Sequence, residues 1–88
     1  MSWFWMNQAM ADLHVAANRE RFATDPDGYL AGYQLTDEER RAIKNRDILK
    51  LWDLGAQPYI MRGFQRRTGM SDSEFRAALK DRSYSERL

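Results

Sequence analysis

Helix-starting and helix-ending residues within positions 35–70 constrain the fold of this 88-residue chain more than any other feature. Thr36 and Glu39 have the spacing of a capping box, in which each side chain accepts a hydrogen bond from the backbone N–H of the other residue. Gly55 suits the left-handed end of a helix, and Pro58 suits the first turn of the next helix, where a missing N–H costs nothing. These signals divide the region into short helices.

Similar signals occur on both sides of that region and predict further short helices. The additional helix-starting residues are Asp25 with Pro26, Asp47, and Ser71 with Glu74. Residues 3–22 instead show apolar side chains at the spacing of one helical face, so we expect a single amphipathic helix there. Its expected inward residues are Met6, Met10, Leu13 and Ala17.

The composition supports an all-helical fold. The chain has only one Val, three Ile and three Thr, whereas residues that favour helices are plentiful. We therefore expect an all-α fold in which residues 1–88 form a single small domain of about five or six short helices. Because the middle helices are short, we expect irregular packing rather than a four-helix bundle. Residues 83–88 are expected to form a frayed tail.

Composition also bears on where the chain works. It has no Cys, which excludes disulfides and thiolate chemistry. Its longest wholly apolar run, Trp3–Met6, is far too short for a membrane span, and no signal-peptide pattern is present. We expect a cytoplasmic protein that does not act at a membrane.

The residues offer no catalytic constellation. His14 is the only histidine, whereas histidine-based zinc and non-haem iron sites use two or three ligands from one protein. No glycine-rich phosphate loop is present. We expect no catalytic, metal-binding or cofactor-binding residue in this chain and no intrinsic activity, and we interpret His14 as a flanking residue of the first helix.

Three arginines form a basic stripe between Leu54 and Ser71, a stretch without any acidic residue. Arg62, Arg66 and Arg67 would suit a small nucleic-acid-binding protein. The net charge is only +1, however, and a solvated outer face is the commoner explanation for such a stripe. Nucleic-acid binding is therefore the less favoured alternative.

Residues 22–70 resemble the LigA family, the small (alpha) subunit of protocatechuate 4,5-dioxygenase-type aromatic-ring-opening (extradiol) dioxygenases. The matching positions are Phe22, Asp25-Pro26, Tyr29-Leu30, Tyr33, Leu35-Thr36, Glu38-Glu39-Arg40, Asp47, Leu54-Gly55, Pro58-Tyr59 and Gly69. This chain departs from the pattern at Gly55-Ala56-Gln57-Pro58, where relatives often have Gly-Gly-Asn or Gly-x-His-Pro.

The resemblance implies a non-catalytic subunit or accessory protein in aromatic compound catabolism. It would pack on a larger catalytic subunit, which holds non-haem iron with its own residues, and would help to close the substrate pocket. The candidate residues for the pocket lid are Gln57, Pro58 and Tyr59.

Consecutive aromatic residues cannot all face one side of a helix, so part of their apolar area should remain exposed and available to a partner. The candidate interface residues are Trp3, Phe4, Trp5, Arg62 and Phe64. A stand-alone, self-associating helical protein remains an alternative.

Overall fold

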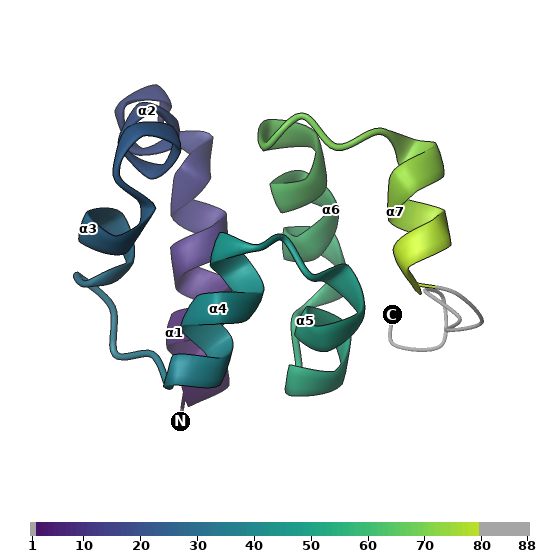
Figure 1. The fold of residues 1–88 in the computed structure, drawn as a ribbon, viewed down its shortest axis with the longest axis horizontal. Coiled ribbons are helices and arrows are strands. Elements are labelled where there is room, and N and C mark those ends of the chain that lie inside the picture. Colours follow the sequence, from purple (N-terminus) through teal and green to yellow (C-terminus); the bar gives the residue numbers. More distant parts are fainter. Residues whose placement is uncertain (1, 80–88) are drawn as a thin grey trace.

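The computed structural model describes residues 2–79, and every regular element within that range is helical, as predicted (Figure 1). The elements are α1 (Ser2–Ala11), the 3₁₀ turn η1 (Asp12–His14), α2 (Ala16–Thr24), α3 (Pro26–Leu30), α4 (Asp37–Lys44), α5 (Ile48–Leu54), α6 (Pro58–Arg67) and α7 (Asp72–Leu79). None of these helices is long and apolar enough to cross a membrane. The predicted tail at 83–88 lies outside the described residues.

The predicted helix starts are confirmed in atomic detail. The Thr36 hydroxyl accepts a 3.1 Å hydrogen bond from the Glu39 N–H, and the Glu39 carboxylate accepts a 2.8 Å bond from the Thr36 N–H. Ser71 and Glu74 form the same reciprocal pair, at 3.1 and 3.2 Å. Gly55 ends α5 with φ of 105°, the left-handed conformation expected of a glycine at this position. Local side-chain chemistry therefore sets these boundaries.

The prediction of one continuous helix over residues 3–22 is wrong. Val15 has an extended backbone that separates η1 from α2, which raises the number of α-helices within residues 2–79 to seven. Side chains of α2 donate hydrogen bonds to the carbonyls at the break. Asn18 donates to the Asp12 carbonyl at 2.9 Å, and Arg19 donates to the carbonyls of Leu13 and His14 at 2.9 and 3.0 Å.

Turning α2 away from the axis of α1 also changes which residues face inward. Met6, Met10 and Leu13 are buried as predicted, but Ala17 is exposed. The contribution of α2 to the interior comes instead from Phe22, whose ring packs edge-on against Tyr29 at 5.8 Å and Phe64 at 6.2 Å between centroids.

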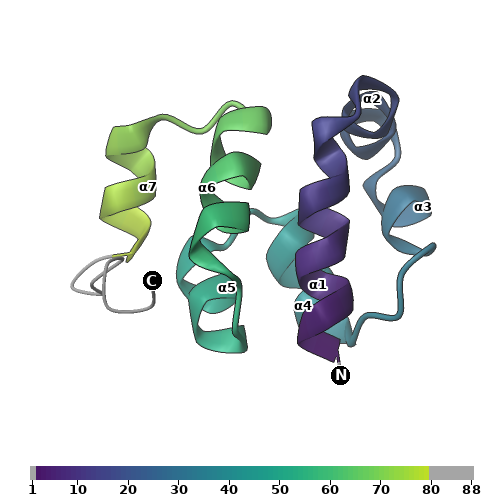
Figure 2. The same cartoon turned by 180° about the vertical axis from the view of Figure 1, so that it is seen from behind.

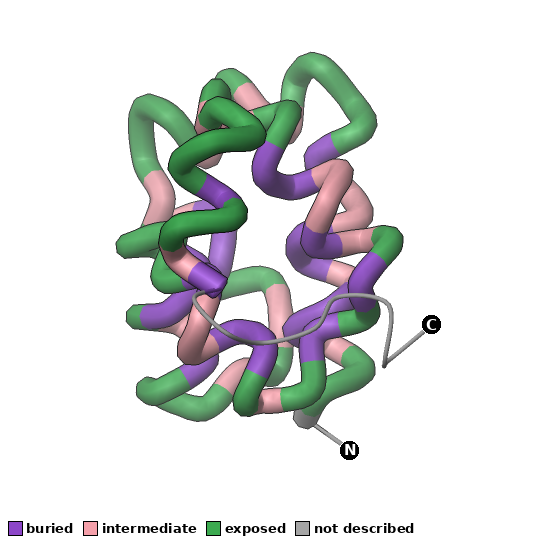
Figure 3. Tube along the Cα trace, turned by 90° about the vertical axis from the view of Figure 1, so that its right-hand side faces the viewer, coloured by how far each residue is buried: buried purple, intermediate pink, exposed green. Residues whose placement is uncertain are grey.

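A single hydrophobic core joins the remaining helices. Its buried residues come from α1, η1, α3, α4, α5, α6 and α7, and from Ala56 in the loop between α5 and α6. In Figure 3 the buried segments of the chain trace lie mainly toward the inside of the molecule, and the exposed segments lie mainly at its periphery. The largest fully buried side chains are Phe64, Met6, Met10, Leu13, Leu30, Ile43, Ile48, Leu51, Met61 and Gln65.

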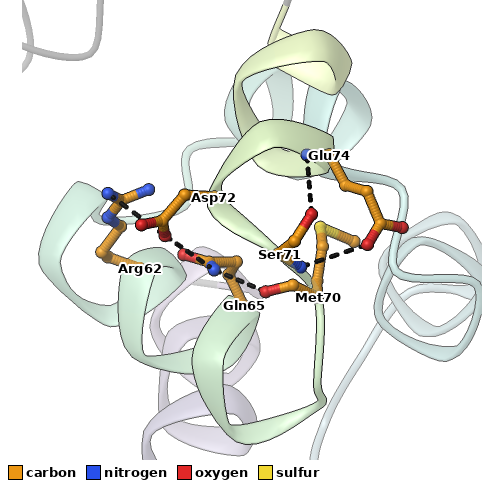
Figure 4. Close-up of polar contacts among 6 residues, drawn as sticks. All are labelled: Arg62, Gln65, Met70, Ser71, Asp72 and Glu74. Carbon is orange, nitrogen blue, oxygen red and sulfur yellow. Dashed lines mark hydrogen bonds and ion pairs between the residues drawn. The ribbon is translucent and has the colours of Figure 1, made fainter.

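Two features of the packing position the surface described below. Helices α1 and α6 lie side by side and run in the same direction, although some fifty residues separate them along the chain (Figure 2). The buried amide of Gln65 in α6 donates to the Met70 carbonyl at 2.6 Å and to the Asp72 carboxylate at 3.2 Å, which ties the start of α7 to α6 (Figure 4).

Candidate functional site

Asn7 joins the two regions that the sequence predicted to face a partner, the aromatic N-terminal segment and the loop before α6. Its side-chain oxygen accepts a 2.7 Å hydrogen bond from the backbone N–H of Gln57. Its side-chain nitrogen donates to the carbonyls of Trp3 at 2.9 Å and Gly55 at 3.4 Å. Because Asn7 is only 6% exposed, these bonds form away from bulk water. The start of α1, the loop over residues 55–57 and the start of α6 therefore form one continuous surface.

The aromatic part of this surface is half exposed. Trp3 and Phe4 are 46% and 49% exposed, whereas Trp5 is partly buried and packs edge-on against Phe4 at 5.1 Å between ring centroids. Trp3 adjoins the loop, because a Cβ placed on Gly55 would lie 3.7 Å from the Trp3 Cβ. Exposed, contiguous apolar area of this kind often marks a protein–protein interface.

The three lid candidates differ in what they present to a neighbouring molecule. The Gln57 side-chain oxygen accepts a 2.9 Å hydrogen bond from the Ile60 N–H and so caps α6. Pro58 is buried at the first position of α6. Tyr59 is 78% exposed, which makes it the residue of the three best placed to contact another chain.

Two other predicted interface residues have internal roles in this chain. Phe64 is fully buried in the core, so its side chain adds nothing to an exposed surface. Arg62 is partly buried, lies 3.5 Å from the Asp72 carboxylate, and places its guanidinium 4.9 Å from the centroid of the Phe75 ring. Both contacts hold α7 against α6, and Figure 4 shows the one to Asp72.

An open groove of about 570 Å³ continues from Tyr59 along the line where α1 and η1 face α6. Its lining residues are Ala11, His14, Tyr59, Ile60, Arg62, Gly63, Arg66 and Arg67. No carboxylate of the described residues lines this groove. The arginine stripe on α6 was visible in the sequence, but the opposite wall was not, because no local pattern links Ala11 and His14 to residues more than forty positions away.

The described residues do not provide a metal centre. Within positions 2–79, no three His, Cys, Asp or Glu side chains lie close enough together to hold a metal ion. His14 is exposed, and its Nδ1 lies 3.0 Å from the Ala11 carbonyl oxygen. This part of the chain therefore does not fit a non-haem iron site of its own.

Fold and surface together define a small helical protein with an exposed aromatic face, an adjoining basic groove and no cluster of metal ligands in its described part. This chain belongs to the LigA family, described as "Aromatic-ring-opening dioxygenase LigAB, LigA subunit", whose profile matches residues 6–86. The match extends well beyond the 22–70 region on which the sequence resemblance depended. No curated protein and no solved structure matched the chain in the corresponding comparisons.

Proposed function

We propose that this chain is a non-catalytic small subunit of a ring-opening dioxygenase and that it packs on a larger catalytic subunit. The observation that carries the proposal is the family match over residues 6–86. The family description names a subunit of a two-component dioxygenase, so a partner chain is the natural binding target.

The chemistry of ring opening would belong to the partner. A non-haem iron bound there would supply dioxygen activation, and the described residues of the present chain offer no ligand cluster that competes for the metal. The contribution of this chain would be to bind the partner and to cover part of its substrate pocket.

The surface described above gives the proposal a location. Trp3 and Phe4 would supply apolar area to the interface, since aromatic residues dominate the energetics of protein–protein contacts. Tyr59 would lie closer to the shared pocket, because its exposed side chain lies in the first turn of α6, which Asn7 holds beside the aromatic residues through the Gln57 N–H. Gln57 would support Tyr59 indirectly by capping the first turn of α6.

Co-expression with a candidate catalytic subunit tests the proposal. The candidate can be taken from the neighbouring gene or captured by pull-down and identified by mass spectrometry. We expect the two chains to co-purify and iron-dependent ring opening of a catechol to require the larger chain. Turnover of a catechol by the small chain alone would refute the non-catalytic assignment.

A symmetric self-association is the second candidate, because the half-exposed Trp3 and Phe4 could also pair with their counterparts in another copy. Sedimentation of the isolated chain separates the two candidates. A stable dimer that persists when a catalytic subunit is added would favour self-association over the heteromeric subunit.

A further inference from the structure

We propose that the groove between α1 and α6 binds the carboxylates of an acidic peptide segment of the catalytic partner. This inference depends on the proposed function for the existence of such a partner, but it concerns a different surface from the aromatic face. It gives a role to the arginine stripe and to His14, which the aromatic interface leaves unexplained.

The groove carries positive charge that no carboxylate of the described residues neutralises. Arg66 and Arg67 are exposed and form no ion pair with another residue of the 2–79 range, whereas Arg62 is already engaged by Asp72. A guanidinium presents a rigid fork of donors that matches the two oxygens of a carboxylate. Two such groups therefore line the groove as charged donors that no carboxylate of residues 2–79 pairs with.

Gly63 shows that Arg67 is turned into the groove rather than outward. A Cβ placed on Gly63 would stand only 2.7 Å from Nη1 of Arg67, and the next nearest atom outside the adjoining helix backbone would be Cζ of the same arginine, at 3.5 Å. The guanidinium therefore lies folded back over the missing side chain of Gly63, which is itself a lining residue of the groove.

His14 supplies a polar group on the opposite wall. Its Nδ1 lies 3.0 Å from the Ala11 carbonyl, which can only accept, so Nδ1 carries the proton in that bond. Nε2 is the ring nitrogen left without a partner among the described residues, and in this tautomer it accepts rather than donates. A carboxylate in the groove would thus find its donors on α6, and the His14 ring would form part of the opposite wall.

The remaining lining favours a peptide over other anions. Ala11, Ile60 and the ring of Tyr59 give the groove an apolar component that suits side chains between acidic residues. The groove is open and Arg66 and Arg67 are exposed, whereas sites for small ligands bury most of the ligand surface. The net charge of only +1 gives the chain little general attraction for a nucleic acid.

Selection from a display library of random dodecapeptides on the immobilised full chain tests the proposal and does not require the partner to be identified first. We expect enrichment of peptides with several Asp or Glu residues, with amide and imidazole NMR shifts confined to Ala11, His14 and residues 59–67. The double variant Arg66→Glu/Arg67→Glu should weaken binding of a selected peptide by about tenfold or more. Enrichment of neutral or basic peptides would overturn the proposal. So would a chain that selects no acidic peptide but binds duplex DNA in a salt-sensitive way.

The matched control is Arg41→Glu/Arg76→Glu. These two arginines are exposed and, like Arg66 and Arg67, lie in the last turns of their helices, so the change in net charge is the same and each substitution again places a carboxylate near a helix C-terminus. Peptide binding should survive in the control. An equal loss in both double variants would mean that the selected peptides respond to net charge and would contradict a specific groove.

Gly63→Ala provides a second test that does not threaten folding. The new methyl group must displace the Arg67 guanidinium from its position over Gly63, so we expect peptide binding to weaken severalfold in a helix that is otherwise intact. Unchanged peptide binding would overturn the assignment of Arg67.

If the groove variants bind the catalytic subunit as the wild type does, the groove inference fails and the subunit assignment survives. If no catalytic subunit binds the wild type, the subunit assignment itself fails.

Discussion

The side-chain oxygen of Asn7 accepts a 2.7 Å hydrogen bond from the backbone N–H of Gln57, a residue fifty positions further along the chain. This bond fixes the start of α1 against the start of α6. The exposed aromatic residues of α1 and the exposed Tyr59 of α6 consequently belong to one rigid face, and a partner that contacts one is placed beside the other.

We predict that Asn7→Ala lowers the free energy of unfolding by about 1–3 kcal/mol, because the N–H of Gln57 and the carbonyl of Gly55 both lose the buried Asn7 side chain as a partner. Urea denaturation followed by circular dichroism measures the change. Asn45→Ala is the control, since Asn45 is exposed and ends α4 through its backbone. A loss no larger than that of the control would contradict the anchoring role of Asn7.

Gly63→Ala should raise the free energy of unfolding by up to about 1 kcal/mol, because Ala has the higher helix propensity and the displaced group is the flexible end of Arg67. The opposite result is expected for Gly55→Ala, because Gly55 has φ of 105° and a side chain is strained in that conformation. Thermal unfolding of the two variants shows whether each substitution raises or lowers the stability. Destabilisation by Gly63→Ala would mean that Gly63 has a structural role beyond making room for Arg67.

Stability at alkaline pH should depend on Tyr33. Its hydroxyl donates a 2.5 Å hydrogen bond to the Asp12 carboxylate, and burial, followed by this bond, raises the pKa of Tyr33 far above its ordinary value. The folded state therefore keeps a proton that the unfolded chain releases near pH 10, so stability is complete below about pH 10 and falls as the pH rises further.

The variant Tyr33→Phe removes that ionisation and should lose stability less steeply above about pH 10. At neutral pH the variant should be less stable than the wild type, because it lacks the hydrogen bond to Asp12. Urea midpoints measured at neutral and alkaline pH test this prediction. Tyr59→Phe removes an exposed phenol and serves as the control. Parallel alkaline curves for Tyr33→Phe and the wild type would contradict the prediction.

The helix boundaries that could be predicted from the sequence are those with local causes. The Thr36–Glu39 and Ser71–Glu74 pairs satisfy backbone groups within three residues, so their spacing alone identifies them. The break at Val15 could not be predicted in this way. It depends on Asn18 and Arg19, which also fit a helical pattern, reaching back to the carbonyls of η1.

The candidate site could be predicted only in part, because contacts between residues far apart in the sequence leave no local pattern. Consecutive aromatic residues indicated an exposed face, but Phe64 looked equally available and is buried in the core. Asn7 was missed because a single Asn in a helix carries no local signal of a bond fifty residues away. The groove was missed because it exists only where α1 and η1 meet α6 in space.

The aromatic face should dominate the affinity for the partner. Trp3→Ala/Phe4→Ala is expected to weaken association by about 2–4 kcal/mol if both are central interface residues. Val15→Ala is the control, because Val15 is 43% exposed but lies at the opposite end of α1 and η1. Isothermal titration calorimetry against the purified partner, with circular dichroism to confirm folding, checks the expectation. Equal affinities for the two variants would mean that another surface makes the contact.

The most direct test of the central claim is size-exclusion chromatography of the wild-type chain mixed with the catalytic subunit, with iron-dependent ring opening assayed across the fractions. The subunit assignment predicts that both chains co-elute with the activity, and that Trp3→Ala/Phe4→Ala releases the small chain into a separate, inactive peak. If the wild-type chain elutes alone and its addition leaves the turnover of the catalytic subunit unchanged, the assignment is contradicted.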